Sequence, residues 1–177
     1  MDMTKLIATF FYTGLAYPAP GTWGSLAALP AAALIFWLGG LEPFLVAIVV
    51  TFFLGWWATA EQTRGSEDHD PSEIVIDEVV GQWIALVPVF IGISHYESTQ
   101  RALEPPVYQN GMLALWPVWL TAFVFFRIFD IGKPGPIGWA DRLGGPIGVM
   151  LDDVIAGIFA GIATIAVAFF YHLVFFG

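Results

Sequence analysis

The chain alternates between long apolar runs and short polar connections. A helix needs about 20 residues to cross roughly 30 Å of hydrocarbon, and helices satisfy their own backbone hydrogen bonds in lipid. The third and fourth runs are the shortest and approach the length of an ordinary buried helix. We therefore expect an all-α, polytopic membrane bundle of about five spans. The runs are residues 24–41, 43–60, 79–95, 112–127 and 154–176.

Composition supports this interpretation. The 177 residues are 58% hydrophobic and 12% charged, with a mean hydropathy of +0.75. A soluble all-α core is the alternative, but a chain of this size cannot bury helices that are apolar all round. We expect residues 1–177 to form a single membrane domain.

Charge and cysteine content remove several classes of function. The net charge of −9 with only six Lys and Arg residues excludes a nucleic-acid backbone as partner. The absence of Cys excludes disulfides, thiolate metal sites and a Cys nucleophile. A site this acidic can handle a phosphate only if a divalent cation inverts the local field.

The distribution of basic residues predicts the orientation. With five crossings and the N-terminus inside, five of the six cations fall in inside segments and only Arg101 falls outside, as the positive-inside tendency requires. Four crossings are the alternative, if the first span is a re-entrant segment broken at Pro30. The five inside cations are Lys5, Arg64, Arg127, Lys133 and Arg142.

The first motif is YPAPGTWGSLAALP, residues 17–30. Gly21 and Gly24 allow close backbone approach, and Ser25 is a good N-cap for the apolar run that follows. A Gly-rich turn that leads into a helix suits an anion. A capped helix start with no ligand is the simpler interpretation.

The second motif is EDHDPSEIVIDEVVGQW, residues 67–83. Asp70, Pro71 and Glu73 fit the N-cap, N1 and N3 positions of a helix. Asp77 and Glu78 would then lie a turn or more inside that helix, where ionised carboxylates are costly unless they are paired or bind a metal. His69 fits a solvated loop better than a ligand position.

The third motif spans residues 126–157 and holds a charged loop between two apolar runs. Arg127 and Asp130 share one face if the preceding run is helical. Asp152 and Asp153 open the next run, in which Gly157 and Gly161 form a small-residue face for helix packing. A second copy of the chain could pack against the same face, so a homodimer is an alternative partner for it. The loop itself could instead be a solvated connection.

Five acids thus gather at the inside ends of three spans, with Arg127 and Lys133 among them. Oxygen ligands without Cys favour hard cations such as Mg²⁺. Carboxylates combined with Lys and Arg are the equipment of phosphoryl transfer, which depends on positioning and charge neutralisation. The candidate metal ligands are Asp77, Glu78, Asp130, Asp152 and Asp153.

The segments PAPGTWGSLAALP, IVIDEVVGQW, FRIFDIGKPGPI and IGVMLDDVIAG resemble the phosphatidylglycerophosphatase A family, in matching order. The resemblance implies a Mg²⁺-dependent lipid phosphatase that converts phosphatidylglycerophosphate into phosphatidylglycerol and inorganic phosphate. It also implies a multi-pass protein of the bacterial inner membrane whose active site faces the cytoplasm. The polar motif residues carried over are Thr22, Ser25, Asp77, Glu78, Arg127, Asp130, Lys133, Asp141, Asp152 and Asp153.

On this basis we expect attack by a metal-activated water on the phosphate of a membrane phospholipid. A CDP-lipid-type phosphatidyltransferase is an alternative, although its usual DGxxAR motif is missing. A small cation transporter is another, although it should carry acids near the middle of its spans. The expected catalytic residues are Asp77, Glu78, Asp130, Lys133 and Asp153, and the expected substrate-binding residues are Thr22, Ser25, Arg127, Lys133 and Asp141.

Overall fold

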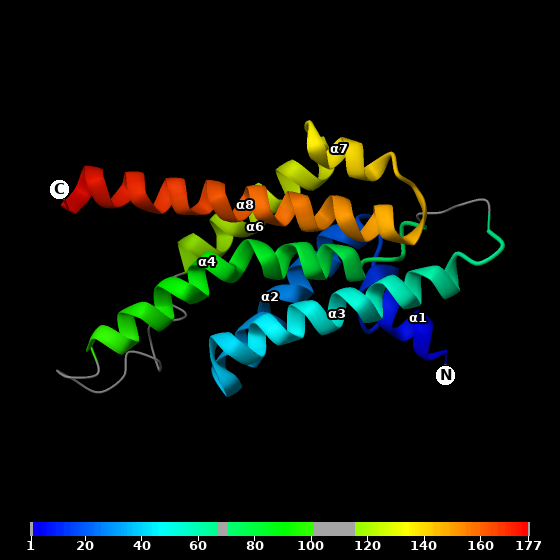
Figure 1. Ribbon diagram of the computed structural model, residues 1–177, viewed down its shortest axis with the longest axis horizontal. Coiled ribbons are helices and arrows are strands. Elements are labelled where there is room, and N and C mark those ends of the chain that lie inside the picture. The colour runs from blue at the N-terminus through cyan, green and yellow to red at the C-terminus, as the bar shows by residue number, and fades with distance from the viewer. Residues whose placement is uncertain (1, 67–70, 101–115, 177) are drawn as a thin grey trace.

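A computed structural model describes residues 2–66, 71–100 and 116–176 (Figure 1). Within these ranges every regular element is a helix, which confirms the expected all-α class. The elements are α1 (Met3–Ala8), the 3₁₀ helix η1 (Thr13–Leu15), α2 (Pro20–Gly39), α3 (Leu41–Gln62), α4 (Ile76–Gln100), α6 (Trp116–Gly132), α7 (Pro136–Asp141) and α8 (Gly145–Phe176).

Four helices of the described part are long and apolar enough to cross a membrane: α2, α3, the Ile76–His95 part of α4 and the Gly145–Val174 part of α8. Helix α6 covers most of the fourth expected span, but its 17 residues extend only about 25 Å. Helix α2 continues through Pro30 without a break, so the interruption expected for a re-entrant segment is absent from it.

Helix α4 forms the centre of the bundle. In the most apolar 18-residue stretch of α4, 61% of the residues are buried inside the protein. In the corresponding stretches of α2, α3 and α8 the share is 22–28%. Helix α2 runs parallel to α4: the Trp83 indole N–H donates to the Ala28 carbonyl at 2.9 Å, and Phe36 stacks on Phe90 at 4.2 Å between ring centroids. Figure 1 shows α8 along a further side of α4. The surrounding helices α2, α3, α6 and α8 therefore bury most of the apolar part of α4.

Helices α4 and α8 also run parallel and approach closely through glycines. A Cβ on Gly157 would lie 2.3 Å from the Gly81 carbonyl oxygen, and one on Gly161 would lie 3.3 Å from the Pro88 ring. The predicted small-residue packing face is therefore confirmed, and the helix that it meets is α4 of the same chain. A homodimer stays a prediction, but this stripe already has a partner.

The N-terminal segment fixes the entry to α4. Asp2 caps α1 by accepting from the Thr4 and Lys5 amides at 3.0 and 3.2 Å, and Gln62 of α3 donates to it at 3.2 Å. Hydrogen bonds from Thr4, Lys5 and Gln62 lower the pKa of Asp2 to about 2. The Val75 amide donates to the Ala8 carbonyl at 2.9 Å, so α1 sets the position at which α4 begins.

Two expected helix starts were wrong. Helix α2 begins at Pro20 with Ala19 as N-cap, because proline at the first helical position loses no hydrogen bond. Ser25 lies one turn inside, where its hydroxyl donates to the Gly21 carbonyl at 2.7 Å. Helix α8 begins at Gly145, so Asp152 lies two turns inside it rather than at its start.

The start of α4 was also misplaced. Pro71 and Glu73 belong to a turn closed by a 2.9 Å bond from the Ile74 amide to the Pro71 carbonyl, and the helix begins only at Ile76. Asp77 and Glu78 therefore occupy its first turn instead of lying deeper. The expected N-cap Asp70 and the loop residue His69 are outside the described residues.

Candidate active site

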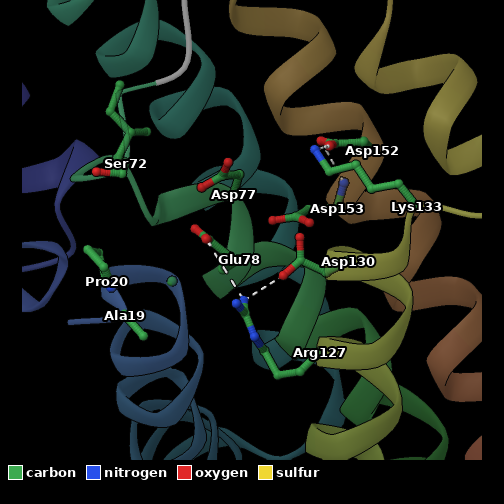
Figure 2. Close-up of a pocket in the computed structure, with 12 residues that line it drawn as sticks. Ala19, Pro20, Ser72, Asp77, Glu78, Arg127, Asp130, Lys133, Asp152 and Asp153 are labelled. Atoms are coloured by element: carbon green, nitrogen blue, oxygen red, sulfur yellow. Dashed lines mark hydrogen bonds and ion pairs between the residues drawn. The ribbon is translucent and has the colours of Figure 1, made fainter. Parts of the chain in front are cut away.

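A cavity of about 300 Å³ lies where the first turns of α2 and α4 meet the end of α6 and the early turns of α8 (Figure 2). All five predicted metal ligands line it, together with both predicted cations. The lining residues are Ala19, Pro20, Gly21, Ser72, Ile74, Asp77, Glu78, Arg127, Asp130, Lys133, Asp152 and Asp153.

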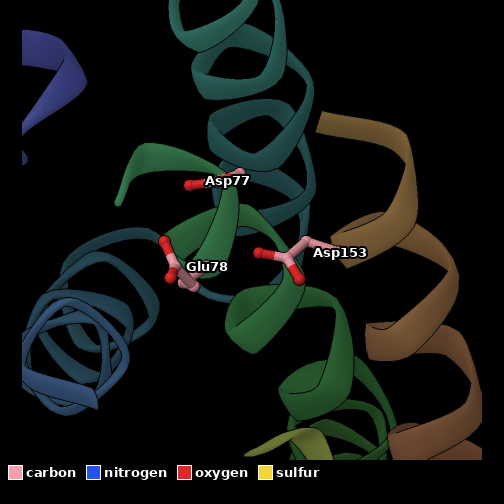
Figure 3. A group of neighbouring side chains, drawn as sticks. All are labelled: Asp77, Glu78 and Asp153. Carbon is pink, nitrogen blue, oxygen red and sulfur yellow. The ribbon is translucent and has the colours of Figure 1, made fainter. Parts of the chain in front are cut away.

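Three carboxylates form the centre of this cavity. Asp77 and Glu78 come from α4 and Asp153 from α8, and one oxygen of each lies within 4.8 Å of the others (Figure 3). The close contact of Gly81 with α8 holds these turns together. We call Asp77, Glu78 and Asp153 the carboxylate triad.

The triad fits a hard cation. Oε2 of Glu78 and Oδ1 of Asp153 are buried, and neither has a hydrogen-bond partner among the described residues. Buried carboxylate oxygens are stable only when a donor or a cation satisfies them. Oxygen ligands at this spacing suit Mg²⁺ or a similar ion. Three of the five acids predicted from sequence as metal ligands therefore form a buried group that could bind a metal ion.

Arg127 lies across the floor of the cavity. Its Nη1 is 2.5 Å from Asp130 Oδ2 and 3.9 Å from Glu78 Oε1 (Figure 2), and it donates to the Ser25 hydroxyl at 3.3 Å. The expected common face of Arg127 and Asp130 is confirmed. Since the guanidinium contacts α2, α4 and α6 residues, it connects three helices beside the triad.

Lys133 lies on the opposite side of the cavity, directly after α6. Its backbone has a φ of 43°, and its ammonium donates to Asp152 at 2.8 Å and also to Asp141. Partial burial opposes its charge, but hydrogen bonds and attraction from Asp141 and Asp152 prevail and raise the pKa of Lys133 above its usual range. Lys133 is therefore a permanent cation at the cavity wall.

Three of the predicted substrate-binding residues do not line the cavity. Ser25 is fully buried behind Arg127, and Asp141 pairs with Lys133 from the outer side. Thr22 lies on α2 next to Gly21 but is not a lining residue. Their substrate-binding roles stay predictions.

The structure adds lining residues that sequence reasoning missed. Ser72 and Ile74 belong to the turn before α4, which was interpreted as helix, and Ala19 and Pro20 belong to the start of α2. Gly21 faces Glu78 and Arg127 with bare backbone. The sequence motif that contains Gly21 was interpreted as a site for a bound anion. That Gly21 instead lies against the carboxylate side chain of Glu78 could not be inferred from sequence.

Comparison with known proteins shows the family of this chain. The family model described as Phosphatidylglycerophosphatase A matches residues 6–168. The chain belongs to that family. A phosphatidylglycerophosphatase A of Haemophilus influenzae is 36% identical over 170 residues, covering 96% of this chain and 91% of that protein. The family resemblance seen in the sequence motifs is thereby confirmed, and with it the assignment to a phosphatase family.

Two further proteins are similar to this chain over most of its length. The Escherichia coli protein of the same name is 34% identical over 155 residues, covering 86% of this chain and 76% of that protein. A Bacteroides thetaiotaomicron protein, named provisionally as a phosphatidylinositol-3-phosphatase, is 38% identical over 172 residues, covering 92% of this chain and 91% of that protein. No solved structure matches the chain.

Proposed function

We propose that this protein is a Mg²⁺-dependent phosphatidylglycerophosphatase, which hydrolyses the terminal phosphate of phosphatidylglycerophosphate to give phosphatidylglycerol and inorganic phosphate. The observation that carries the proposal is the carboxylate triad between Arg127 and Lys133, in one cavity of a membrane-type helical chain of this family. We further propose a bacterial inner-membrane location with the cavity facing the cytoplasm, as the distribution of cations favours.

The net charge of the cavity explains why a cation is needed. Five carboxylates and two cations line it, which leaves three negative charges when all are ionised. A phosphate monoester is also anionic, so it would be repelled from the cavity as it stands. A divalent cation held by Asp77, Glu78 and Asp153 would neutralise phosphate charge and supply an activated water as nucleophile.

Asp130 and Asp152 lie beside the triad and differ from it in how they are paired. Each is paired with a cation of the chain, Asp130 with Arg127 at 2.5 Å and Asp152 with Lys133 at 2.8 Å. We assign them two functions: they add negative charge beside the metal ligands, and they hold the two cations at the cavity wall. Both remain candidate ligands, as their sequence motifs indicated.

Arg127 and Lys133 would bind the phosphate from two sides. A guanidinium presents several N–H donors in one plane, and an ammonium donates as a compact charge. The raised pKa of Lys133 keeps it charged at every pH of interest. Ser25 and Asp141 contact these cations from behind, so we propose that they serve substrate binding by orienting Arg127 and Lys133.

Phosphate release by the purified protein in detergent tests the proposal. We expect the wild type to release phosphate from phosphatidylglycerophosphate in Mg²⁺ and to release none in EDTA. The Asp77→Asn variant should release none in Mg²⁺ even when its thermal unfolding matches that of the wild type. Phosphatidylinositol 3-phosphate is the comparison substrate, given the name of one relative. Equal phosphate release by the folded protein in EDTA would contradict the proposed metal requirement. A preference for the inositol lipid would contradict the proposed substrate.

A further inference from the structure

Gln82 is a polar residue in the apolar part of α4 that the proposed chemistry does not use. Its side chain is fully buried, and neither its amide oxygen nor its amide nitrogen has a hydrogen-bond partner among the described residues. A buried amide without partners is costly, and such groups are rare in folded proteins. An apolar residue at this position would be expected unless the amide has a function.

The helix register places Gln82 directly below the active site. It lies one turn after Glu78, on the same face of α4. On the parallel helix α2, Gly24 packs against Val75 and the Ala28 carbonyl accepts from Trp83. Gln82 therefore lies level with the turn around Ala28, and the Ser25 hydroxyl lies about one turn nearer the cavity.

The same level on α6 is occupied by Arg127. A Cβ on Gly81, the residue before Gln82, would lie 2.5 Å from the Phe126 ring, and Arg127 follows Phe126. Arg127 also donates to Ser25 at 3.3 Å. Three polar side chains from three helices, Gln82, Ser25 and Arg127, thus lie within about a turn of one another at the inner end of the cavity.

Arg127 has an unused donor that matches the unused acceptor of Gln82. Its Nη1 is engaged by Ser25 and Asp130, whereas its Nε is buried and has no partner among the described residues. Among the described residues outside the carboxylate triad, two other buried side-chain atoms lack a hydrogen-bond partner, the Trp119 indole nitrogen and the Thr59 hydroxyl oxygen, and both lie elsewhere. Trp119 packs against Phe90, two turns farther along α4, and Thr59 is on α3.

We propose that Gln82 is a positioning residue for Arg127, whose Nε–H donates to the Gln82 amide oxygen when substrate is bound. The contact would fix the plane of the guanidinium from behind and leave its outer edge free for the substrate phosphate. This inference rests on the proposed function, in which Arg127 binds that phosphate. The expected kinetic signature is weaker substrate binding with little change in the turnover of bound substrate.

Gln82→Met is the test variant, because Met is similar in length and flexibility but cannot accept this bond. We expect KM for phosphatidylglycerophosphate to rise about tenfold, the size of one lost hydrogen bond to a charged group, with kcat changed less than about threefold. Thr164→Val is the matched control, since Thr164 is a buried hydroxyl of α8 outside the cavity lining. Its KM should stay at the wild-type value.

A double-mutant cycle separates positioning from a purely structural role. In an Arg127→Lys background the Nε–H donor is gone, so Gln82→Met should raise KM no further. An unchanged KM in Gln82→Met, or the same tenfold rise in both backgrounds, would overturn the inference while leaving the proposed function intact. A wild-type protein that releases no phosphate from this lipid would overturn the proposed function and the inference with it.

Discussion

Oε1 of Glu78 lies 2.1 Å from the point that a Cβ on Gly21 would occupy, and Nη1 of Arg127 lies 3.2 Å from the same point. The first turn of α2 therefore acts as a wall against which a triad carboxylate and the Arg127 guanidinium both pack. Only a glycine leaves room for them there.

The first prediction concerns this wall. Gly21→Ala should fold with little loss of stability, because the displaced atom is the end of a flexible side chain. Activity should fall by about a hundredfold, since a shift of about 1 Å in a catalytic group can have that effect. The checks are kcat/KM in detergent and the midpoint of thermal unfolding. Gly92→Ala is the control, since nothing lies within 4 Å of its added Cβ, and it should keep full activity.

The second prediction concerns metal and stability. Mg²⁺ should raise the thermal midpoint of the wild type if, as proposed, the folded triad binds it; at a hundred times Kd the gain is about 2.7 kcal/mol. Asp153→Asn should lose this Mg²⁺ response and, in EDTA, should unfold at a higher temperature than the wild type, because a neutral amide replaces a buried carboxyl group whose Oδ1 has no hydrogen-bond partner among the described residues. Differential scanning calorimetry of each protein in Mg²⁺ and in EDTA measures both effects.

The surface variant Glu61→Gln, which removes a carboxylate paired with Arg64, should respond to Mg²⁺ as the wild type does. A full Mg²⁺ response in Asp153→Asn would remove that residue from the metal site.

The third prediction concerns the crossing of α4 and α8. Gly157→Ala would drive a methyl group into the Gly81 carbonyl, whose backbone cannot move away without separating the helices. We expect a loss of about 3 kcal/mol, the upper end of overpacking effects, together with a loss of activity because the triad spans both helices. Gly161→Ala meets only the edge of the Pro88 ring at 3.3 Å and should be tolerated better. Equal unfolding midpoints for the two variants would refute this account.

The fourth prediction concerns pH. The pKa of Lys133 is raised above its ordinary value of 10.5, so the stability from its pairs with Asp141 and Asp152 is fully present below about pH 10.5. It should disappear only as the pH rises through the raised pKa. The difference in thermal midpoint between wild type and Lys133→Met should therefore be constant from pH 7 to about 10. A difference that vanished by pH 9 would show that these carboxylates do not hold the charge.

Local sequence rules predicted the parts of the site that depend on one helix. The spacing of Arg127 and Asp130 was enough to place them on one face, and the glycines at 157 and 161 were enough to predict a close helix neighbour. The expected burial of acids at one end of the bundle followed from the apolar runs.

Contacts between distant segments limited what the sequence could predict. The start of α4 depends on the bond from Val75 to Ala8, which overrides the capping pattern seen at Pro71 and Glu73. The wall formed by Gly21 and the level of Gln82 depend on how α2, α4 and α6 are aligned with one another. No periodicity within a single segment carries that information.

Helix α8 has one more consequence. Its apolar part, Gly145–Val174, is 30 residues long, about 45 Å, whereas a bilayer core is about 30 Å thick. A bilayer-spanning α8 would have to lean within the bilayer or project beyond it, and a thicker membrane would draw it more upright. Because Asp152 and Asp153 belong to this same helix, a change in its lean would move them relative to the rest of the cavity lining. We therefore expect activity to depend on bilayer thickness, and the enzyme reconstituted in lipids of graded chain length would test this.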